Sequence, residues 1–124
     1  MKNILITGCS SGIGLQTAKT LKENGIKVYA SARKEEDVRK LNDLGFETFL
    51  LDVTKKEDIS NALEQILKND NKIDAVFNNA GYGQPGAVED ISIEVLKEQF
   101  ETNVFGLHEL TRQIIPIFRK QSSG

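Results

Sequence analysis

The feature that most constrains the fold is a regular alternation of short apolar runs with longer amphipathic stretches. Apolar runs at 4–6, 28–30, 46–51 and 73–77 are each followed by apolar residues that recur at helical spacing. Strands that alternate with helices imply a parallel sheet whose two faces are both covered. Right-handed crossovers then leave few topologies. The sequence therefore predicts an α/β fold with a doubly wound parallel sheet and the strand order 3-2-1-4.

Length and composition exclude several classes of protein. The 124 residues suit one domain at most, and 39% hydrophobic residues are too many for a disordered chain. A net charge of −2 gives no electrostatic case for nucleic acid or an acidic membrane surface. No apolar run approaches the roughly 20 residues of a membrane helix. The one cysteine cannot form an intrachain disulfide and fits a reducing compartment, so we expect a cytoplasmic protein.

Two later helices have features that predict their boundaries. Thr54 and Glu57 have the spacing of a capping box, which predicts that Thr54 caps the third helix. A long helix is predicted from Ser92 to about Arg119, with a kink or an early end at Pro116. Its predicted buried stripe consists of Leu96, Phe100, Leu107, Leu110 and Ile114.

The turn between the first strand and the first helix is rich in glycine and reads Thr7-Gly8-Cys9-Ser10-Ser11-Gly12-Ile13-Gly14. Glycine is suited to positive φ and to places where the backbone approaches a ligand closely. A helix that begins there offers free N–H groups and partial positive charge to a pyrophosphate. The segment is not a P-loop, because no Lys-Ser/Thr pair follows Gly14. It therefore predicts a dinucleotide site, with Gly14 passing close to the pyrophosphate.

Three motifs in this order resemble the short-chain dehydrogenase/reductase family. They are the Thr-Gly-x-x-x-Gly-Ile-Gly turn at 7–14, Asn78-Asn79-Ala80-Gly81 after the fourth strand, and Asn103 on the long helix. The resemblance covers essentially the whole chain and implies a Rossmann-type fold that binds NAD or NADP. It also implies hydride transfer to or from a small alcohol, ketone or aldehyde. The stretch 78–112 looks most like members that act on retinoids, steroids or similar compounds.

The end of the second strand indicates which cofactor is preferred. NAD-binding folds place an acidic residue about 20 positions after the glycine turn, where it binds the ribose 2′-OH. This chain has Ala32 there, followed by Arg33, whose planar guanidinium can pair with a 2′-phosphate. We therefore expect NADP, with a solvated arginine at a strand end as the alternative.

The resemblance assigns further cofactor contacts. It implies that Asp52 and Val53 contact the adenine, and that Asn79, Ala80 and Gly81 lie along the nicotinamide ribose. It also implies that Asn78 ties the fourth strand to its neighbours. The alternatives are that Asp52 caps the third helix and that the Asn-Gly segment is an ordinary turn.

Asn103 falls on the predicted apolar stripe, between Phe100 and Leu107. A buried amide without partners costs about 1–3 kcal/mol, so its presence there needs a reason. The alternative is a core amide satisfied by local hydrogen bonds. The resemblance instead implies the catalytic asparagine, which bends the helix and holds a water of the proton relay.

Other polar residues are predicted to have ordinary roles. Cys9 has no histidine pattern that would make it a catalytic thiolate, and the single histidine, His108, is predicted to be structural. One histidine and one cysteine do not suffice for a metal site. The charged run 34–37 is predicted to be a solvated helix start.

The family's Tyr-x-x-x-Lys pair has no match in this sequence. The two tyrosines, Tyr29 and Tyr82, are followed four positions on by Arg33 and Gly86. We therefore expect residues 1–124 to be one partial domain, the cofactor-binding half of an oxidoreductase, inactive alone and without its catalytic serine, tyrosine and lysine. The alternative is a non-catalytic nucleotide-binding or regulatory module. An open edge on the fourth strand and the apolar long helix predict association, as a homo-oligomer or otherwise.

Overall fold

Four parallel strands form one sheet in the order β3-β2-β1-β4, which confirms the predicted α/β fold and strand order. The computed structural model describes residues 1–124. The strands are β1 (Asn3–Ile6), β2 (Lys27–Ala32), β3 (Glu47–Leu50) and β4 (Ala75–Phe77). Because β1 lies between β2 and β4, the turn that follows β1 opens at the centre of the sheet's carboxyl edge.

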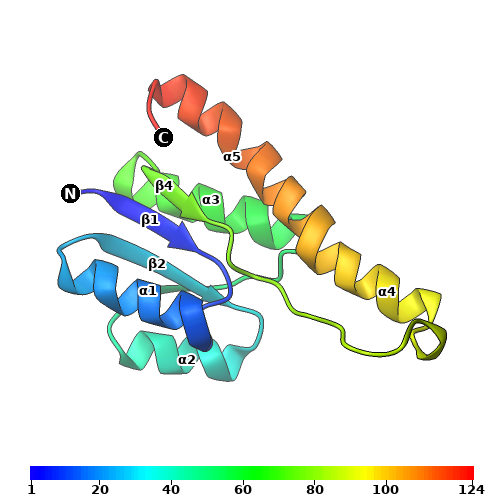
Figure 1. Ribbon diagram of the computed structural model, residues 1–124. Coiled ribbons are helices and arrows are strands. Elements are labelled where there is room, and N and C mark those ends of the chain that lie inside the picture. Colours follow the sequence, from blue (N-terminus) through cyan, green and yellow to red (C-terminus); the bar gives the residue numbers. More distant parts are fainter.

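Helices cover both faces of this sheet (Figure 1). One face carries α1 (Gly12–Glu23) and α2 (Glu35–Asp43), and the other carries α3 (Lys56–Asp70) and α5 (Leu107–Gln121). A short 3-10 helix (Val88–Asp90) precedes α4 (Ile93–Phe100), which extends beyond the sheet. Six residues in π-helical conformation, Glu101–Gly106, join α4 to α5. We refer to them as the π segment.

The alternation of side chains along each strand divides the core in two. Leu5 and Tyr29 pack on the side of α3 and α5, whereas Ile6, Val28 and Ala30 pack on the side of α1 and α2. Successive residues of a strand point to opposite faces, so a sheet covered on both faces needs apolar residues at consecutive positions. This requirement accounts for the unbroken apolar runs in the sequence.

The fourth strand is shorter than predicted, because β4 begins at Ala75 and not at Ile73. The backbone N–H of Asp74 donates to Oδ1 of Asn3 at 2.8 Å, and the N–H of Asn3 donates to Oδ2 of Asp74 at 2.8 Å. At this position, hydrogen bonds to side chains thus take the place of the backbone hydrogen bonds that would pair β1 with a longer β4.

The predicted capping box is wrong. The N-cap of α3 is Lys55, and it makes no side-chain cap. Thr54 instead donates through its N–H and its hydroxyl to Oδ1 of Asp52, at 2.9 and 2.7 Å. Asp58, inside the first turn, accepts from the N–H of Asp52 at 3.0 Å. Asp52 and Asp58 therefore hold the loop between β3 and α3 together. Because the Thr54 hydroxyl is bound to Asp52, it does not cap α3.

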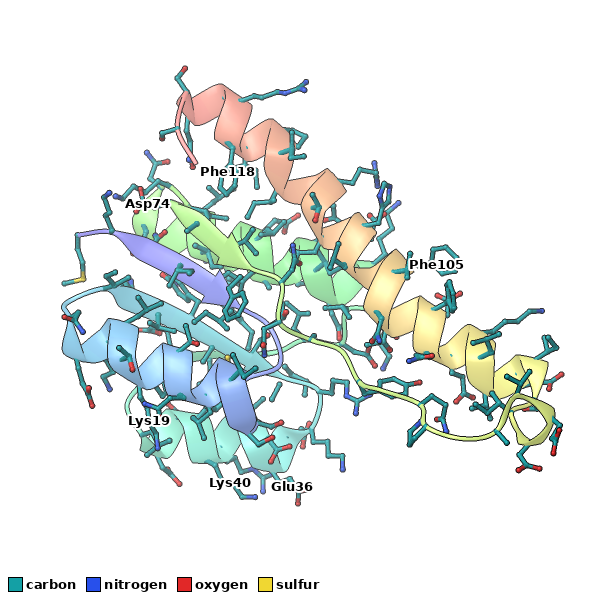
Figure 2. All side chains as sticks on the ribbon, in the orientation of Figure 1. Lys19, Glu36, Lys40, Asp74, Phe105 and Phe118 are labelled. Carbon is teal, nitrogen blue, oxygen red and sulfur yellow. The ribbon has the colours of Figure 1, made fainter.

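The long helix covers about the predicted residues, but of its predicted buried stripe only Leu110 and Ile114 are buried. It continues through Pro116 to Gln121, so the predicted early end is wrong. Leu96, Phe100 and Leu107 are 40%, 46% and 41% exposed. The buried positions are Thr102, Gly106, Leu110 and Ile114. A π segment holds more residues per turn than an α-helix, so it shifts the buried face relative to the α-helical pattern. Figure 2 shows Phe105 pointing outward and Phe118 pointing toward the sheet.

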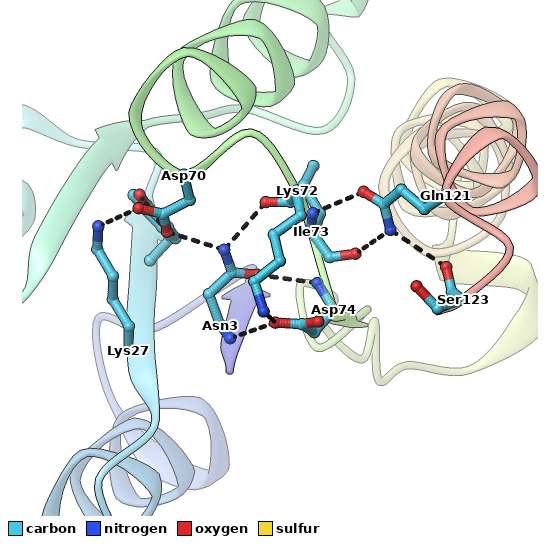
Figure 3. A network of polar contacts seen from close by, with 9 residues as sticks. Asn3, Lys27, Asp70, Lys72, Ile73, Asp74, Gln121 and Ser123 are labelled. Atoms are coloured by element: carbon cyan, nitrogen blue, oxygen red, sulfur yellow. Dashed lines mark hydrogen bonds and ion pairs between the residues drawn. The ribbon is translucent and has the colours of Figure 1, made fainter. Parts of the chain in front are cut away.

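A polar network closes the amino-terminal end of the sheet (Figure 3). Asp70 accepts from Lys27 at 2.6 Å, from Nδ2 of Asn3 at 2.8 Å and from the hydroxyl of Tyr29 at 2.9 Å. Burial opposes ionisation of Asp70, but these three donors outweigh it and lower the pKa of the carboxyl. Hydrogen bonding from Lys72 likewise lowers the pKa of Asp74.

These lowered pKa values predict how stability depends on pH. A carboxyl whose pKa is lower in the folded state stabilises the fold above its unfolded pKa of about 4, and this contribution is lost as pH falls through the folded value. We expect Asp70→Asn to reduce the free energy of unfolding by about 1–3 kcal/mol at pH 7. The difference from wild type should shrink below about pH 4. Urea denaturation over a pH series measures both effects.

The matched control is Glu64→Gln on the exposed side of the same helix, which should have little effect at any pH. A difference between wild type and Asp70→Asn that stayed constant down to pH 2 would show that the charge of Asp70 contributes nothing.

Candidate functional site

A cavity of about 450 Å³ lies at the carboxyl ends of the strands. Ligands of open α/β sheets bind at this edge. Most of the predicted site residues line this cavity, although they come from four separate loops: Gly8, Ser10, Ser11, Ile13, Arg33, Val53, Asn79, Ala80 and Gly81. Gly12, Gly14, Asp52 and Asn103 are predicted site residues that do not line it. The sheet topology thus gathers the motifs into one place.

The glycines of the turn after β1 serve different purposes. Gly8 and Gly12 have φ of 68° and 59°, which L side chains rarely adopt. A Cβ at Gly8 would also lie 2.9 Å from Cα of Ala80. At Gly14, a Cβ would lie 2.4 Å from both Nδ2 of Asn79 and the carbonyl oxygen of Gly8. The contact that excludes a side chain at Gly14 is therefore within the chain itself, and not only with a ligand as predicted.

The N-terminus of α1 opens on the cavity. Its N-cap, Ser11, makes no side-chain cap, and Ser10 and Ser11 are both exposed. The first N–H groups of a helix have no partner within the helix, so they are available to an anion. Ile13, one of the predicted site residues, is 73% exposed and lines the cavity. It therefore contributes an apolar wall beside the anion site.

The loop after β4 is held against the turn after β1 by hydrogen bonds. Asn79 donates through Nδ2 to the carbonyl oxygens of Thr7 and Gly8, at 3.1 and 3.0 Å. The N–H groups of Asn79 and Ala80 donate to the hydroxyl of Thr7, at 3.1 and 3.0 Å. Asn78, expected to tie β4 to its neighbours, donates through Nδ2 to the hydroxyl of Thr111 on α5 at 3.2 Å. The Asn-Asn pair therefore fixes this loop to two different elements.

Asn103 lies in the π segment and is half-buried rather than part of a core stripe. Its Nδ2 donates to the carbonyl oxygen of Tyr82 at 2.6 Å, and its Oδ1 accepts from the N–H of Tyr82 at 2.9 Å. Gln99 also donates to the Tyr82 carbonyl, at 3.3 Å. Both polar atoms of the Asn103 side chain are thus bound to the backbone of one residue of the β4 loop, Tyr82. This geometry is that of an amide satisfied by its neighbours.

Arg33 is exposed at the cavity rim and forms no ion pair, whereas Ala32 before it is 2% exposed. Arg33 also lines an adjoining hollow of about 590 Å³ that contains Asp52, Glu98 and Glu101. Asp52 is therefore next to the main cavity and not on it. A cation without a carboxylate partner is available to an anionic ligand.

Some cavity residues were not identified from the sequence. Lys34 and Asp37 line the cavity, although the run 34–37 was predicted to be merely solvated. Tyr82, Leu51 and Thr102 also line it. Leu51 precedes Asp52 and Tyr82 follows Gly81, so adjacency to a motif was the available signal for these two. Thr102 likewise precedes Asn103, but Asn103 itself does not line the cavity, so this neighbour could not indicate where Thr102 lies.

Cys9 points away from the cavity into the core. It is fully buried, and its Sγ donates to the carbonyl oxygen of Ile6 at 3.3 Å. Burial raises the pKa of the Cys9 thiol to about 11, so it is uncharged at neutral pH. The structure contains no group of three or more His, Cys, Asp or Glu residues that could hold a metal ion. None of its helices has the length and hydrophobicity required to cross a membrane.

A family model described as short chain dehydrogenase matches residues 2–124. The chain is 40% identical over 124 residues to an uncharacterized oxidoreductase, YbbO, of Escherichia coli, covering 99% of this chain and 46% of that protein. The 3-ketoacyl-(acyl-carrier-protein) reductase of Brucella melitensis complexed with NADH superposes with a TM-score of 0.90 and 32% identity, over 96% of this chain and 50% of that one. The structure of ElxO with NADP bound superposes with a TM-score of 0.90 and 28% identity, over 99% of this chain and 52% of that one. The chain spans about half the length of these proteins.

The packing around Gly14 predicts a cost for any side chain there. Gly14→Ala would place a methyl group against Asn79 and the Gly8 carbonyl. We expect it to reduce the free energy of unfolding by about 1–3 kcal/mol, as overpacking does. Gly83→Ala is the control, because that glycine has open space around its Cβ position. Chemical denaturation followed by circular dichroism compares the two. Equal stabilities would contradict the close packing of the two loops.

Proposed function

Because the chain belongs to the short-chain dehydrogenase family, we propose that its cavity binds NADP(H) and that residues 1–124 form the cofactor-binding half of an oxidoreductase. Arg33 carries this proposal. It stands at the cavity rim beside Ala32 without a carboxylate partner, where NAD-binding folds have an acidic residue. The remaining residues of the cavity fit the other parts of the dinucleotide.

The pyrophosphate is assigned to the N-terminus of α1. Gly8, Ser10, Ser11 and Ile13 surround this end of the helix, and the turn's positive-φ glycines keep its backbone free of side chains. The helix contributes N–H donors and the positive end of its dipole. Gly12 does not line the cavity, but it lies between Ser11 and Ile13, which do, and its positive φ of 59° shapes the turn at the start of the helix. Gly14 supports the site indirectly, through its contacts with Asn79 and Gly8.

The 2′-phosphate is assigned to Arg33. A guanidinium forms paired hydrogen bonds with phosphate oxygens and stays charged at any physiological pH. Lys34, which also lines the cavity, adds a second positive charge nearby. Arg33 is the one cation that lines the adjoining hollow, which it shares with the carboxylates of Asp52, Glu98 and Glu101. The neighbouring structures carry NADH in one case and NADP in the other, so the fold alone does not choose between them.

The two ends of the dinucleotide are assigned to opposite parts of the cavity. The adenine is placed at Val53 and Asp52, where the apolar Val53 side chain forms the wall and Asp52 the outer rim. The nicotinamide ribose is placed along Asn79, Ala80 and Gly81. The hydrogen bonds from Asn79 to the β1 turn hold that segment in place before any ligand arrives. Such preorganisation reduces the ordering cost of binding.

When bound, the cofactor would supply hydride transfer. We propose that the substrate is a small alcohol, ketone or aldehyde, with retinoids and steroids as the favoured class. Asn103 is proposed to set the position of Tyr82 beside the nicotinamide end, since both polar atoms of its side chain bind the Tyr82 backbone. Its role in a proton relay is a further part of the proposal. Tyr29 is fully buried at the opposite end of the sheet, bound to Asp70, so it does not serve as the general acid.

Cofactor preference is tested by replacing Arg33. We expect Arg33→Ala to weaken NADP binding by about 10- to 100-fold, which is the loss of a charged hydrogen bond. Binding of NAD, which lacks the 2′-phosphate, should not change. The matched control is Arg39→Ala on α2, whose side chain is 78% exposed and pairs with Glu35. Calorimetric titration of residues 1–124 measures the affinities of wild type and both variants for NADP and NAD. Equal wild-type affinities for NADP and NAD would refute the assignment.

Association and inactivity of residues 1–124 are tested on one purified sample. β4 pairs only with β1, which leaves its other edge unpaired. Phe105 on the π segment is 55% exposed. We expect light scattering to give a mass above the monomer and Phe105→Lys to lower it. Val88→Lys, at a site 92% exposed on the 3-10 helix, is the control.

The same sample should not oxidise NADPH with aldehydes or ketones, because Tyr29 is bound to Asp70 and Tyr82 has glycine four positions on. A monomer that turns over these substrates would contradict both expectations.

A further inference from the structure

The fold buries the polar side chains of Asn3, Thr7, Ser31 and Thr102. Three of them have protein partners: Asn3 bonds Asp70, Thr7 bonds the β4 loop, and Ser31 donates to the carbonyl of Ile6. Thr102 is 7% exposed, and its hydroxyl makes no hydrogen bond within the chain. Thr111, further along the chain in α5, instead donates to the carbonyl oxygen of Leu107 at 2.7 Å. Of the buried hydroxyl side chains, those of Thr7 and Ser31 have hydrogen-bond partners within the chain, whereas that of Thr102 has none.

The Thr102 hydroxyl faces a cavity rather than the core. Thr102 lines both the main cavity and the adjoining hollow of Arg33 and Asp52. No fully enclosed side-chain oxygen or nitrogen in the structure lacks a partner, so the unpartnered oxygen of Thr102 has accessible surface, and the spaces that Thr102 lines are these two. A buried hydroxyl that is free of protein partners and open to a cavity is suited to bind a ligand there.

Close packing of the π segment holds Thr102 in this position. Gly106 lies on the same buried face, four residues along. A Cβ at Gly106 would lie 2.7 Å from Cγ2 of Val53 and 2.9 Å from its carbonyl oxygen. Glycine thus allows the π segment to approach the loop after β3. This approach places Thr102 beside Val53 on the cavity wall.

The wall around Thr102 differs from the rest of the cavity. The α1 end offers N–H donors and the Arg33 corner offers positive charge, whereas Leu51 and Val53 near Thr102 are apolar and 2% and 4% exposed. A planar base fits such an apolar wall, and its polar edge needs hydrogen-bond partners. A hydroxyl both donates and accepts. We propose that Thr102 is a nucleobase-binding residue whose hydroxyl bonds the edge of the adenine. This inference rests on the proposed function.

The test uses the isosteric substitution Thr102→Val in residues 1–124, with 2′,5′-ADP and nicotinamide mononucleotide as probes. We expect affinity for 2′,5′-ADP to fall about 3- to 10-fold, the effect of one neutral hydrogen bond. Affinity for nicotinamide mononucleotide should not change, because that probe lacks the adenine. Thr102→Ser, which keeps the hydroxyl, should bind 2′,5′-ADP nearly as wild type does. The melting temperature of Thr102→Val should be equal to or above that of wild type, because no protein hydrogen bond is lost.

The possible outcomes separate this inference from the proposed function. If wild type binds 2′,5′-ADP and Thr102→Val binds it equally well, the role of Thr102 is refuted and the nucleotide site stands. A lower melting temperature or failure of Thr102→Val to fold would show that the hydroxyl is structural, which also refutes the inference. If wild type binds neither 2′,5′-ADP nor NADP, the proposed function and this inference fail together.

Discussion

The site depends on the hydrogen bonds that join the loop after β4 to the turn after β1. β1 and β4 pair along only three residues, so the sheet alone does not fix the loops that follow them. The Thr7 hydroxyl accepts from two successive N–H groups, and the Asn79 amide donates to two successive carbonyls. These bonds satisfy backbone groups that would otherwise be left unpaired beyond the strand ends. The two loops consequently form one rigid floor for the cavity.

Charges are arranged differently at the two ends of the sheet. At the amino end, Asp70 and Asp74 are paired with Lys27 and Lys72, at 2.6 and 2.8 Å. At the carboxyl end, Arg33 has no ionic partner. Cys9 lies within the turn there but stays uncharged, because burial raises its pKa. Paired charges stabilise a fold only modestly, whereas an unpaired cation beside a helix N-terminus creates a field that attracts anions. The carboxyl end of the sheet, where we propose that the phosphates bind, is thus the end that carries an unpaired cation.

Much of this arrangement could be predicted from the sequence because its causes are local. Apolar runs, glycine stops and the order of elements suffice for the strand order, and the loops at a sheet's carboxyl edge must then meet. The errors arose where tertiary contacts override local pattern. Thr54 had the spacing of a cap, but the carboxylate of Asp52 lies two residues before it and binds its hydroxyl. Leu107 had the spacing of a buried residue, but the π segment before it shifts the buried face of the helix and leaves Leu107 41% exposed.

The π segment is the clearest case of tertiary control, because its geometry follows from what it must contact. Its buried positions and those of α5 are spaced by four residues, at Thr102, Gly106, Leu110 and Ile114. In a regular α-helix, four residues turn by about 400°, so such a line drifts by about 40° at each step. A wider turn reduces this drift and keeps the line facing the sheet. The wider turn also directs the Asn103 side chain at the backbone N–H and carbonyl of Tyr82. The two hydrogen bonds formed there offset the poorer helical geometry of the π segment. The same distortion therefore closes the core, fixes the β4 loop and brings a free hydroxyl to the cavity.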